Sequence, residues 1–492
     1  MERGPIVCSV RDLFKVLASL TIFLMLSGFL GSEDRTFIPA SGFDRAVRLR
    51  EEGRYQQSLE ILEKEINGPY SQENPGYRGR CWLNLALDYW NLGEVSRAEN
   101  AFIYVLALVG EIKDEGLRDY AQTALTIIKL YKEGKAYKEE KKYKESKNIF
   151  NEAIHLSKQN EMYEFCLKCL RQLSFVYWSG NEIGPILGLN EEALYISRKI
   201  NNFYEQIRSL NQLGSYYFNK KNFLKSHDYF DRALVLAEKE NLLHKEPVIL
   251  FNLAVTSSQL GLYDLCQNYI ERALEFYQKG DDLPTTISLL SQLAISIHKK
   301  SVVNGPFLNK EKPRELLSTA LELSRQAGFR DLEAQMLNNL GFILLEVEPE
   351  KARKLCLQSL KLGEELGDQK VIAASLNNLA TLSFKENAIH RAQELYSRSL
   401  STALKVDYWG EIWTNYYGLA RCLEKQGDYA HAIQNYQKAL EALNPLRDNI
   451  TFDLYRIGFD RGKKYVYEGL IRSLVKYRLE HPGLQADKLV FS

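Results

Sequence analysis

Residues 416–440, YYGLARCLEKQGDYAHAIQNYQKAL, carry the pattern that decides the fold of this chain. Small residues such as Ala420 and Ala432 alternate with bulky ones such as Tyr436, at spacings of three, four and seven. These spacings place each kind of residue on one face of an α-helix. Gly427 interrupts the pattern, because glycine is a frequent turn residue. The stretch therefore predicts two amphipathic helices joined by a short turn.

The same unit recurs from residue 43 onward. Each copy has a small marker residue in its first predicted helix, and most markers are 40 residues apart. The markers are Ala46, Ala86, Gly134, Ser174, Gly214, Ala254, Ala294, Gly341, Ala380 and Ala420. A leucine precedes the marker in eight of these ten units. The chain therefore predicts about ten helical hairpins, each of which packs on its neighbours.

This unit resembles the tetratricopeptide repeat. Its step of 40 residues exceeds the ordinary repeat length of about 34, and the extra residues fall where the second helix continues, as in residues 234–241 and 440–444. In this respect the chain resembles the long-helix subclass found in kinesin light chains and many bacterial regulators and scaffolds. The resemblance covers about residues 43–444. It implies an all-α fold, a right-handed α-solenoid of about ten helix-turn-helix repeats, and a role in binding proteins or peptides.

We divide the chain into a hydrophobic N-terminal segment (1–40), the solenoid (41–445), and a C-terminal connector with a capping helix (446–492). Two repeats depart from the regular step of 40 residues. Residues 110–116 lengthen the second repeat. The glycine and prolines of residues 301–313 predict a protruding loop between the two helices of the seventh repeat.

The N-terminal segment has basic residues before an apolar run at residues 16–30. It predicts a signal peptide or a membrane anchor, with the solenoid outside the cytoplasm, on the periplasmic side of a bacterium. The alternative is a mis-assigned start codon and a cytoplasmic protein. The free cysteines favour that alternative, because oxidising compartments select against them.

Composition and motifs exclude several classes of function. The 64 basic and 63 acidic residues leave a net charge of +1, so we expect no nucleic-acid binding. Cys166 and Cys169 form a CxxC inside a helical pattern without further ligands, which favours packing over metal binding. No motif of a hydrolase, a phosphate-binding loop or a metalloprotease occurs. We expect no enzymatic activity, no cofactor and no metal.

A primary amide lies two residues before the marker in seven of the ten units. These residues are Asn84, Gln172, Gln212, Asn252, Gln292, Asn339 and Asn378. In a hairpin stack the first helices line the concave face, and this position is turned about 200° from the marker. A side-chain amide both donates and accepts, so a ladder of amides matches a peptide backbone. Similar asparagine ladders in long-helix tetratricopeptide proteins grip peptide backbones, which the resemblance implies here. The alternative is that the amides bridge successive first helices and stiffen the solenoid.

Neighbouring positions add further groove residues, which are Asn211, Phe251, Trp178 and Phe218. Amides mixed with aromatic side chains suit a protein or extended peptide with apolar anchors. The groove positions lack the lysine and arginine density of a carboxylate clamp. We expect contact with a membrane only through the N-terminal segment.

The last 47 residues resemble, through Arg447, Tyr455, Phe459 and Tyr467, the connector that joins such repeats to CHAT-type caspase-like peptidase domains. The chain carries no matching His and Cys dyad, so we assign it no protease activity. The alternative function is a sensor or regulatory part of a split or truncated CHAT-type system. The predicted helix at residues 463–479 caps the solenoid, as repeat arrays require.

Overall fold

The computed structural model describes residues 42–112, 114–245, 247–277, 282–304, 311–447 and 464–481. Within these ranges the chain is built of helices joined by short turns, and it contains no strand there. It divides into two compact units, residues 1–121 and 122–492. The predicted N-terminal segment and most of the connector lie outside the described residues. Among the helices that the structure describes, none is both long and apolar enough to cross a membrane.

The first unit contains two hairpins. They pair α2 (Gly42–Glu51) with α3 (Tyr55–Asn67) and α5 (Pro75–Leu92) with α6 (Val95–Ile112), with the short helix α4 (Pro69–Glu73) between the two pairs. The side chain of Asn74 caps α5 by accepting a hydrogen bond from the Tyr77 amide, and Pro75 follows in the first turn. Gly93 ends the helix with a φ of 88°. Helix α7 (Glu115–Glu139) then runs across the boundary between the units.

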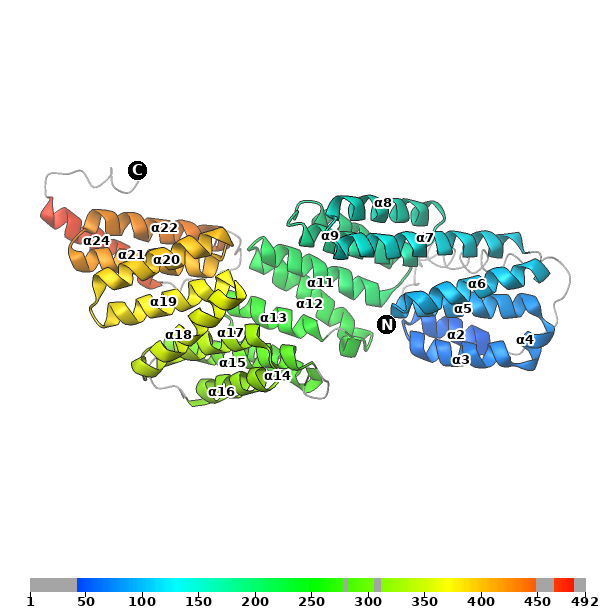
Figure 1. The fold of residues 1–492 in the computed structure, drawn as a ribbon, viewed down its shortest axis with the longest axis horizontal. Helices are drawn as coiled ribbons and strands as arrows, with labels where there is room; N and C mark the ends of the chain where they lie inside the picture. The colour runs from blue at the N-terminus through cyan, green and yellow to red at the C-terminus, as the bar shows by residue number, and fades with distance from the viewer. Residues whose placement is uncertain are drawn as a thin grey trace, which may run out of the picture. The chain divides into compact units, whose positions relative to one another are not determined.

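Eight more hairpins follow in the described residues, from α7 and α8 to the last pair, and a final helix comes after them (Figure 1). After α7 come α8 (Tyr143–Gln159), α9 (Tyr163–Ser179), α10 (Ile186–Lys199), α11 (Phe203–Asn219), α12 (Phe223–Lys239), the 3₁₀ helix η1 (Leu243–Lys245), α13 (Val248–Gln259), α14 (Tyr263–Tyr277), α15 (Leu283–Asn304), α16 (Glu311–Gln326), α17 (Arg330–Leu344), α18 (Pro349–Leu366), α19 (Gln369–Lys385), α20 (Ile389–Lys405), α21 (Trp409–Gln426), α22 (Tyr429–Arg447) and α24 (Lys464–Glu480). The predicted all-α architecture of helix-turn-helix repeats is confirmed.

All ten marker residues lie buried in the first helices of their hairpins. The glycine markers show why small residues occur there. A Cβ atom on Gly214 would lie 2.5 Å from the Phe230 ring, and one on Gly134 would lie 2.9 Å from the Phe150 ring. Ser226 also donates a 2.9 Å hydrogen bond to the Gly214 carbonyl oxygen. The small marker therefore lets the second helix approach closely enough to pack and to form a hydrogen bond.

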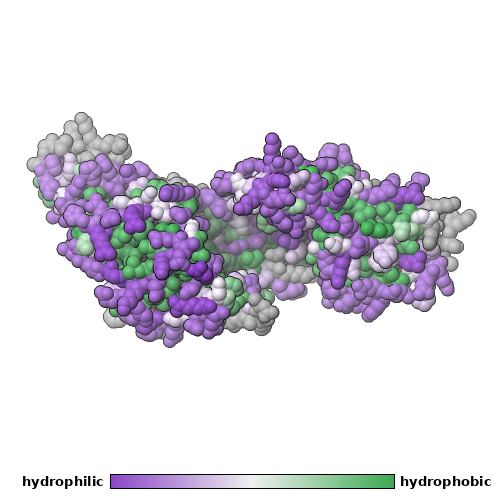
Figure 2. Space-filling model, in the orientation of Figure 1, coloured by the Kyte–Doolittle hydropathy of each residue, from purple (hydrophilic) through white to green (hydrophobic). Residues whose placement is uncertain are grey.

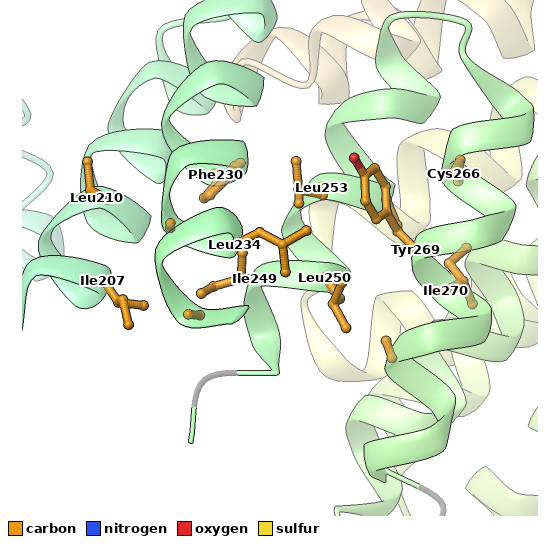
Figure 3. Close-up of a cluster of buried hydrophobic side chains, with 14 of the residues drawn as sticks. Ile207, Leu210, Phe230, Leu234, Ile249, Leu250, Leu253, Cys266, Tyr269 and Ile270 are labelled. Carbon is orange, nitrogen blue, oxygen red and sulfur yellow. The ribbon is translucent and has the colours of Figure 1, made fainter. Parts of the chain in front are cut away.

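The core is continuous from one hairpin to the next. Figure 3 shows Leu210 of α11, Phe230 of α12 and Leu250 and Leu253 of α13 in one cluster, and that cluster extends to Ile270 of α14. Full burial of one such side chain stabilises the fold by about 1.5 to 3 kcal/mol. Because each hairpin completes the core of its neighbour, a single hairpin would leave part of this apolar surface in water.

The predicted lengthening of the second repeat takes the form of longer helices, and the interruption in the seventh repeat is shorter than predicted. Residues 110–112 still belong to α6, and α7 begins at Glu115, so the extra residues lengthen a helix rather than a loop. Helix α7 has 25 residues, against 17 in α9 and α11. Likewise α15 continues to Asn304 and α16 begins at Glu311, which leaves a shorter connection than the predicted 301–313 loop. Helix propensity and packing outweigh single glycine and proline residues near helix ends.

Candidate functional site

The first helices of the second unit line the inner side of its curved stack. Helices α15, α17, α19 and α21 contact one another in succession, whereas the second helices contact chiefly first helices. The side with the closer helices is the inner side of the curvature. We call the faces of α9 to α21 on this side the inner surface, which includes the half-buried Arg208, Asn211 and Phe251.

The predicted amides largely face the preceding hairpin rather than open solvent, which corrects the expected geometry. Asn378 is only 6% exposed. Its Nδ2 donates to Asn338 Oδ1 at 2.9 Å, and its side chain hydrogen-bonds the Cys356 thiol. Gln292 likewise bonds the thiol of Cys266. The first helix of a hairpin packs between its own second helix and the second helix of the preceding hairpin. A side chain that points away from its own second helix therefore meets the preceding hairpin.

Other amides bridge neighbouring helices. Asn339 Nδ2 donates to Ser291 Oγ at 3.0 Å, from α17 to α15. In the first unit, Asn84 accepts a hydrogen bond from Arg50 and donates to the Arg80 carbonyl oxygen at 2.9 Å. The bridging alternative therefore describes a part of the amide ladder.

Gln172 and Gln212 differ from these bridges. Gln172 hydrogen-bonds the Tyr131 hydroxyl, and its buried Oε1 has no partner in the described part of the chain. Gln212 is half-buried and makes no side-chain hydrogen bond to any residue that the structure describes.

Asn211 and Asn252 form an amide pair that keeps two hydrogen-bonding ends available. Asn252 Nδ2 donates to Asn211 Oδ1 at 2.9 Å, which links α13 to α11. Within the described residues, Asn211 Nδ2 and Asn252 Oδ1 have no other partner, and neither is buried without contact to solvent. Phe251 lies next to this pair and packs partly on the core of α11 to α15. The inner surface therefore offers a donor, an acceptor and an aromatic ring at one place.

The predicted aromatic positions have different surroundings. Trp178 is half-buried on α9. Phe218 lies 5.2 Å, between ring centroids, from Phe223, and the Phe223 ring lies 5.6 Å from Trp409 of α21. Phe218 thus belongs to a packed contact between distant hairpins rather than to an open pocket.

The contact between Phe223 and Trp409 brings α21 against the hairpin of α11, so the two ends of this part of the inner surface meet. Phe223, Leu260 and Trp413 belong to one buried cluster, and Lys221 Nζ lies 3.0 Å from Asp407 Oδ1. The turns that follow α11 and α13 therefore meet the beginning of α21, and Figure 1 shows the ends of α11 and α20 side by side.

A buried cluster of charges occurs where the sequence indicated no cationic density. Arg171 Nη1 binds both carboxylate oxygens of Glu205, at 2.7 and 2.8 Å. Burial alone would raise the pKa of Glu205, but Arg171 and Arg208 outweigh burial and hold it below its usual value. Burial, reinforced by Arg171, lowers the pKa of Lys168 to about 7. The signal for this cluster was an arginine and a glutamate 34 residues apart, about one ordinary repeat length.

A second charged group joins α15 to α21. Burial lowers the pKa of Lys299 and raises that of Glu411 to about 7, and the two side chains interact electrostatically. The hydroxyl of Thr414 lies 3.3 Å from Glu411 Oε2. These residues lie too far apart in the sequence for helical periodicity to bring them together.

The structure gives the CxxC cysteines a packing role. Both thiols are buried, and burial raises the pKa of Cys166 to about 12. In the described ranges no group of three or more His, Cys, Asp or Glu residues could hold a metal. The face of the molecule in Figure 2 is mostly hydrophilic, with hydrophobic residues between the polar ones.

Comparison with known families agrees with this architecture. Models of the tetratricopeptide repeat match residues 371–444, 130–160 and 248–279. These stretches are tetratricopeptide repeats. They cover most of α19 to α22, the last part of α7 with α8, and the hairpin α13–α14. The expected connection to CHAT-type proteins stays a prediction.

Among solved structures, the chain is similar to a Rap protein complexed with Competence and Sporulation Factor, at 18% identity and a TM-score of 0.47 over 72% of this chain and 99% of that one. The apo form of RapI has 14% identity and a TM-score of 0.47 over 72% and 98% of the two chains. Yeast Tom70 has 16% identity and a TM-score of 0.37 over 92% and 98%. No curated protein matches the sequence.

Proposed function

We propose that this chain is a non-catalytic scaffold that binds an extended peptide segment of a partner protein along the inner surface of its second unit. The observation that carries the proposal is the Asn211–Asn252 pair. The available Nδ2 and Oδ1 of this pair match the C=O and N–H of a peptide backbone. Such binding does not depend on the ligand's side chains at that point.

Specificity then comes from neighbouring side chains. Phe251 offers an aromatic surface for an apolar anchor of the ligand. A ligand with an apolar side chain next to the backbone groups that the amide pair binds would fit this place.

A library of random linear 12-residue peptides displayed on phage provides the probe, with the full chain immobilised. Synthetic versions of the enriched peptides are then titrated by fluorescence anisotropy. We expect the variant Asn211→Ala/Asn252→Ala to bind them about 10 to 100 times more weakly, because a typical hydrogen bond contributes about 1 kcal/mol. Its thermal stability should change little, because both side chains are partly exposed.

The matched control is Asn160→Ala/Asn435→Ala. Asn160 is exposed at the end of the second helix α8, Asn435 is half-buried on the second helix α22, and each side-chain amide donates to the carbonyl oxygen four residues earlier. This variant should bind as the unchanged chain does. Failure to enrich any peptide, or equal affinity for the Asn211→Ala/Asn252→Ala variant, would contradict the proposal. A large loss of stability with binding intact would instead favour the bridging role of the amides.

The predicted location also stays a proposal. Residues 1–40 fused to a reporter should carry it to the membrane or out of the cytoplasm. A reporter that fractionates with soluble cytoplasmic proteins would contradict this.

A further inference from the structure

The contact of α21 with the turns after α11 and α13 closes a succession of first helices on itself. Helices α11, α13, α15, α17, α19 and α21 contact one another in this order, and α21 then returns to the first two. We call the residues of this contact the clasp. They are Lys221, Phe223 and Leu260 on one side and Asp407, Trp409 and Trp413 on the other. With the clasp closed, these six helices surround the part of the inner surface that they line.

The clasp is apolar at a position where other repeats are polar. Leu260 lies six residues after its marker and is 0% exposed. In four other repeats the same position holds an exposed polar residue, namely Glu140, Lys220, Glu386 and Gln426. Leu260 therefore fits the contact with α21 rather than the packing of its own hairpin.

Phe223 shows the same effect of α21. It lies nine residues after its marker and is 1% exposed. The residues at this position in four other repeats, Tyr143, Tyr263, Ile389 and Tyr429, are only half-buried. The ring of Trp409 lies 5.6 Å from the Phe223 ring, between centroids, and accounts for the difference.

An ion pair adds specificity to the clasp. Lys221 Nζ lies 3.0 Å from Asp407 Oδ1, although the two residues are 186 positions apart. Both residues have left-handed backbone conformations, with φ values of 61° and 47°. In most described turns glycine or asparagine holds this position, because other side chains are strained there. A cation and an anion thus occupy two strained turn positions that meet five hairpins apart.

The clasp can open while every hairpin stays folded. The described backbone hydrogen bonds outside the helices are all local in sequence, so none of them crosses the clasp. The side chain of Asp407 is 75% exposed, and exposed ion pairs stabilise little. Five hairpins share the displacement, and each needs only a small rotation.

Two buried charges weaken the closed clasp further. Burial raises the pKa of Glu411 to about 7 and lowers that of Lys299, so both side chains lose hydration where α21 meets α15. This loss offsets part of the stabilisation from the apolar residues. The closed and open states are therefore closer in free energy than the apolar contact alone would make them.

We propose that the clasp is a gate, which opens to admit an extended peptide to the Asn211–Asn252 pair and closes around it. This inference rests on the proposed function. Phe218, which packs on the clasp, follows Asn211 by seven residues on α11, or about 10 Å along the helix. A segment within a partner protein continues on both sides and does not thread through a closed turn of helices. It enters from the side, which requires an open clasp.

Distances between spin labels, measured by double electron–electron resonance in the full chain, test whether the clasp opens. The labels are placed by Asn219→Cys/Lys405→Cys, at exposed positions on either side of the clasp. The six described native cysteines are buried, and Cys8 is replaced by serine. We expect a short and a long distance. Trp409→Ala should raise the ratio of open to closed chains at least about tenfold, because it removes an aromatic contact.

Charge reversal tests the ion pair and serves if Trp409→Ala unfolds in circular dichroism melts. Lys221→Glu should raise the ratio of open to closed chains about threefold to tenfold, and Lys221→Glu/Asp407→Lys should restore it. Lys141→Glu is the matched control. Lys141 has the same left-handed turn conformation, with a φ of 61°, and is exposed after α7. This variant should leave the distances unchanged.

A covalent link tests the gate itself. Lys221→Cys/Asp407→Cys, joined by a short bismaleimide, holds the clasp closed. The peptides enriched from the phage library should associate with the linked chain at least about tenfold more slowly than with the unlinked variant in stopped-flow fluorescence. Binding to the unlinked variant shows that the site itself is intact.

Three results would overturn the proposal. They are a single short distance in every variant, equal association rates with and without the link, and no rescue by the double charge reversal. Failure to enrich any peptide would contradict the proposed function, and the distance distributions would still decide whether the clasp opens.

Discussion

Replacing Gly214 by alanine tests whether the marker residues set the distance between the two helices of a hairpin. Alanine ordinarily stabilises the interior of a helix by about 0.5 to 1 kcal/mol relative to glycine. At this site, however, the new Cβ atom would lie 2.5 Å from two ring carbons of Phe230. Phe230 is 2% exposed and surrounded by core residues. The ring has little room to retreat.

The expected magnitude follows from these two opposing effects. Overpacking of a well-packed core costs about 1 to 3 kcal/mol, and the helix gain offsets up to about 1 kcal/mol of it. We therefore expect Gly214→Ala to lower the stability of the second unit by about 1 to 2 kcal/mol. The additional substitution Phe230→Leu removes the ring, so Gly214→Ala should cost less in the Phe230→Leu background than alone.

Local stability is best measured by hydrogen exchange of α11 and α12, because repeat arrays do not always unfold in a single step. The control is Gly188→Ala in α10, where a Cβ atom would have no neighbour within 4 Å. That variant should be neutral or slightly stabilised. If Gly214→Ala stabilised α11 and α12 as much as Gly188→Ala stabilises α10, close packing at the marker would not be the reason for its small size.

Three further predictions concern buried groups of the second unit. Glu205→Gln leaves Arg171 buried without its anion and should destabilise the unit by about 3 to 5 kcal/mol in urea denaturation; a loss below about 1 kcal/mol would show that solvent screens the pair. The pKa of Glu205 is lower in the folded chain than in the unfolded chain. The ionised side chain therefore stabilises the fold at a pH above the unfolded-state pKa, and this stabilisation is lost as the pH falls through the folded-state pKa. Acid should consequently destabilise the unchanged chain more than the Glu205→Gln variant. The six thiols that the structure describes as buried should react with a disulfide reagent slowly in the native protein and fully in denaturant, and fast native reaction of any of these six would contradict their burial. Phe223→Ala should cost about 3 to 5 kcal/mol and accelerate hydrogen exchange at the start of α21, whereas unchanged exchange there would exclude closure through Phe223.

The hairpins were predictable because their signal is local. Spacings of three and four residues define helix faces, and the small markers indicate where a second helix must approach. The same reasoning misjudged the end of α15 and the start of α16, because Asn304 and Glu311 are helical although they lie within the predicted 301–313 loop.

The site was only partly predictable. Asn252 hydrogen-bonds Asn211, and Phe251 packs partly on the core of the same hairpins, while their role in a binding groove stays a prediction. Asn378 and Gln292 instead bond the preceding hairpin, because a position two residues before the marker faces a neighbour that single-helix periodicity does not reveal. Ion pairs between hairpins had a detectable signal in opposite charges near one repeat apart, such as Arg314 with Glu348.

The sequence by itself determined the number, order and inward faces of the hairpins, since these depend on residues within one repeat. Only the tertiary structure decided that α21 meets the turns after α11 and α13. The physical reason is that each hairpin adds a small rotation to the stack, and the total rotation over several hairpins decides which distant surfaces meet. The sequence of one repeat predicts how it packs on the next repeat, but it does not predict the total rotation and therefore not a contact five hairpins away.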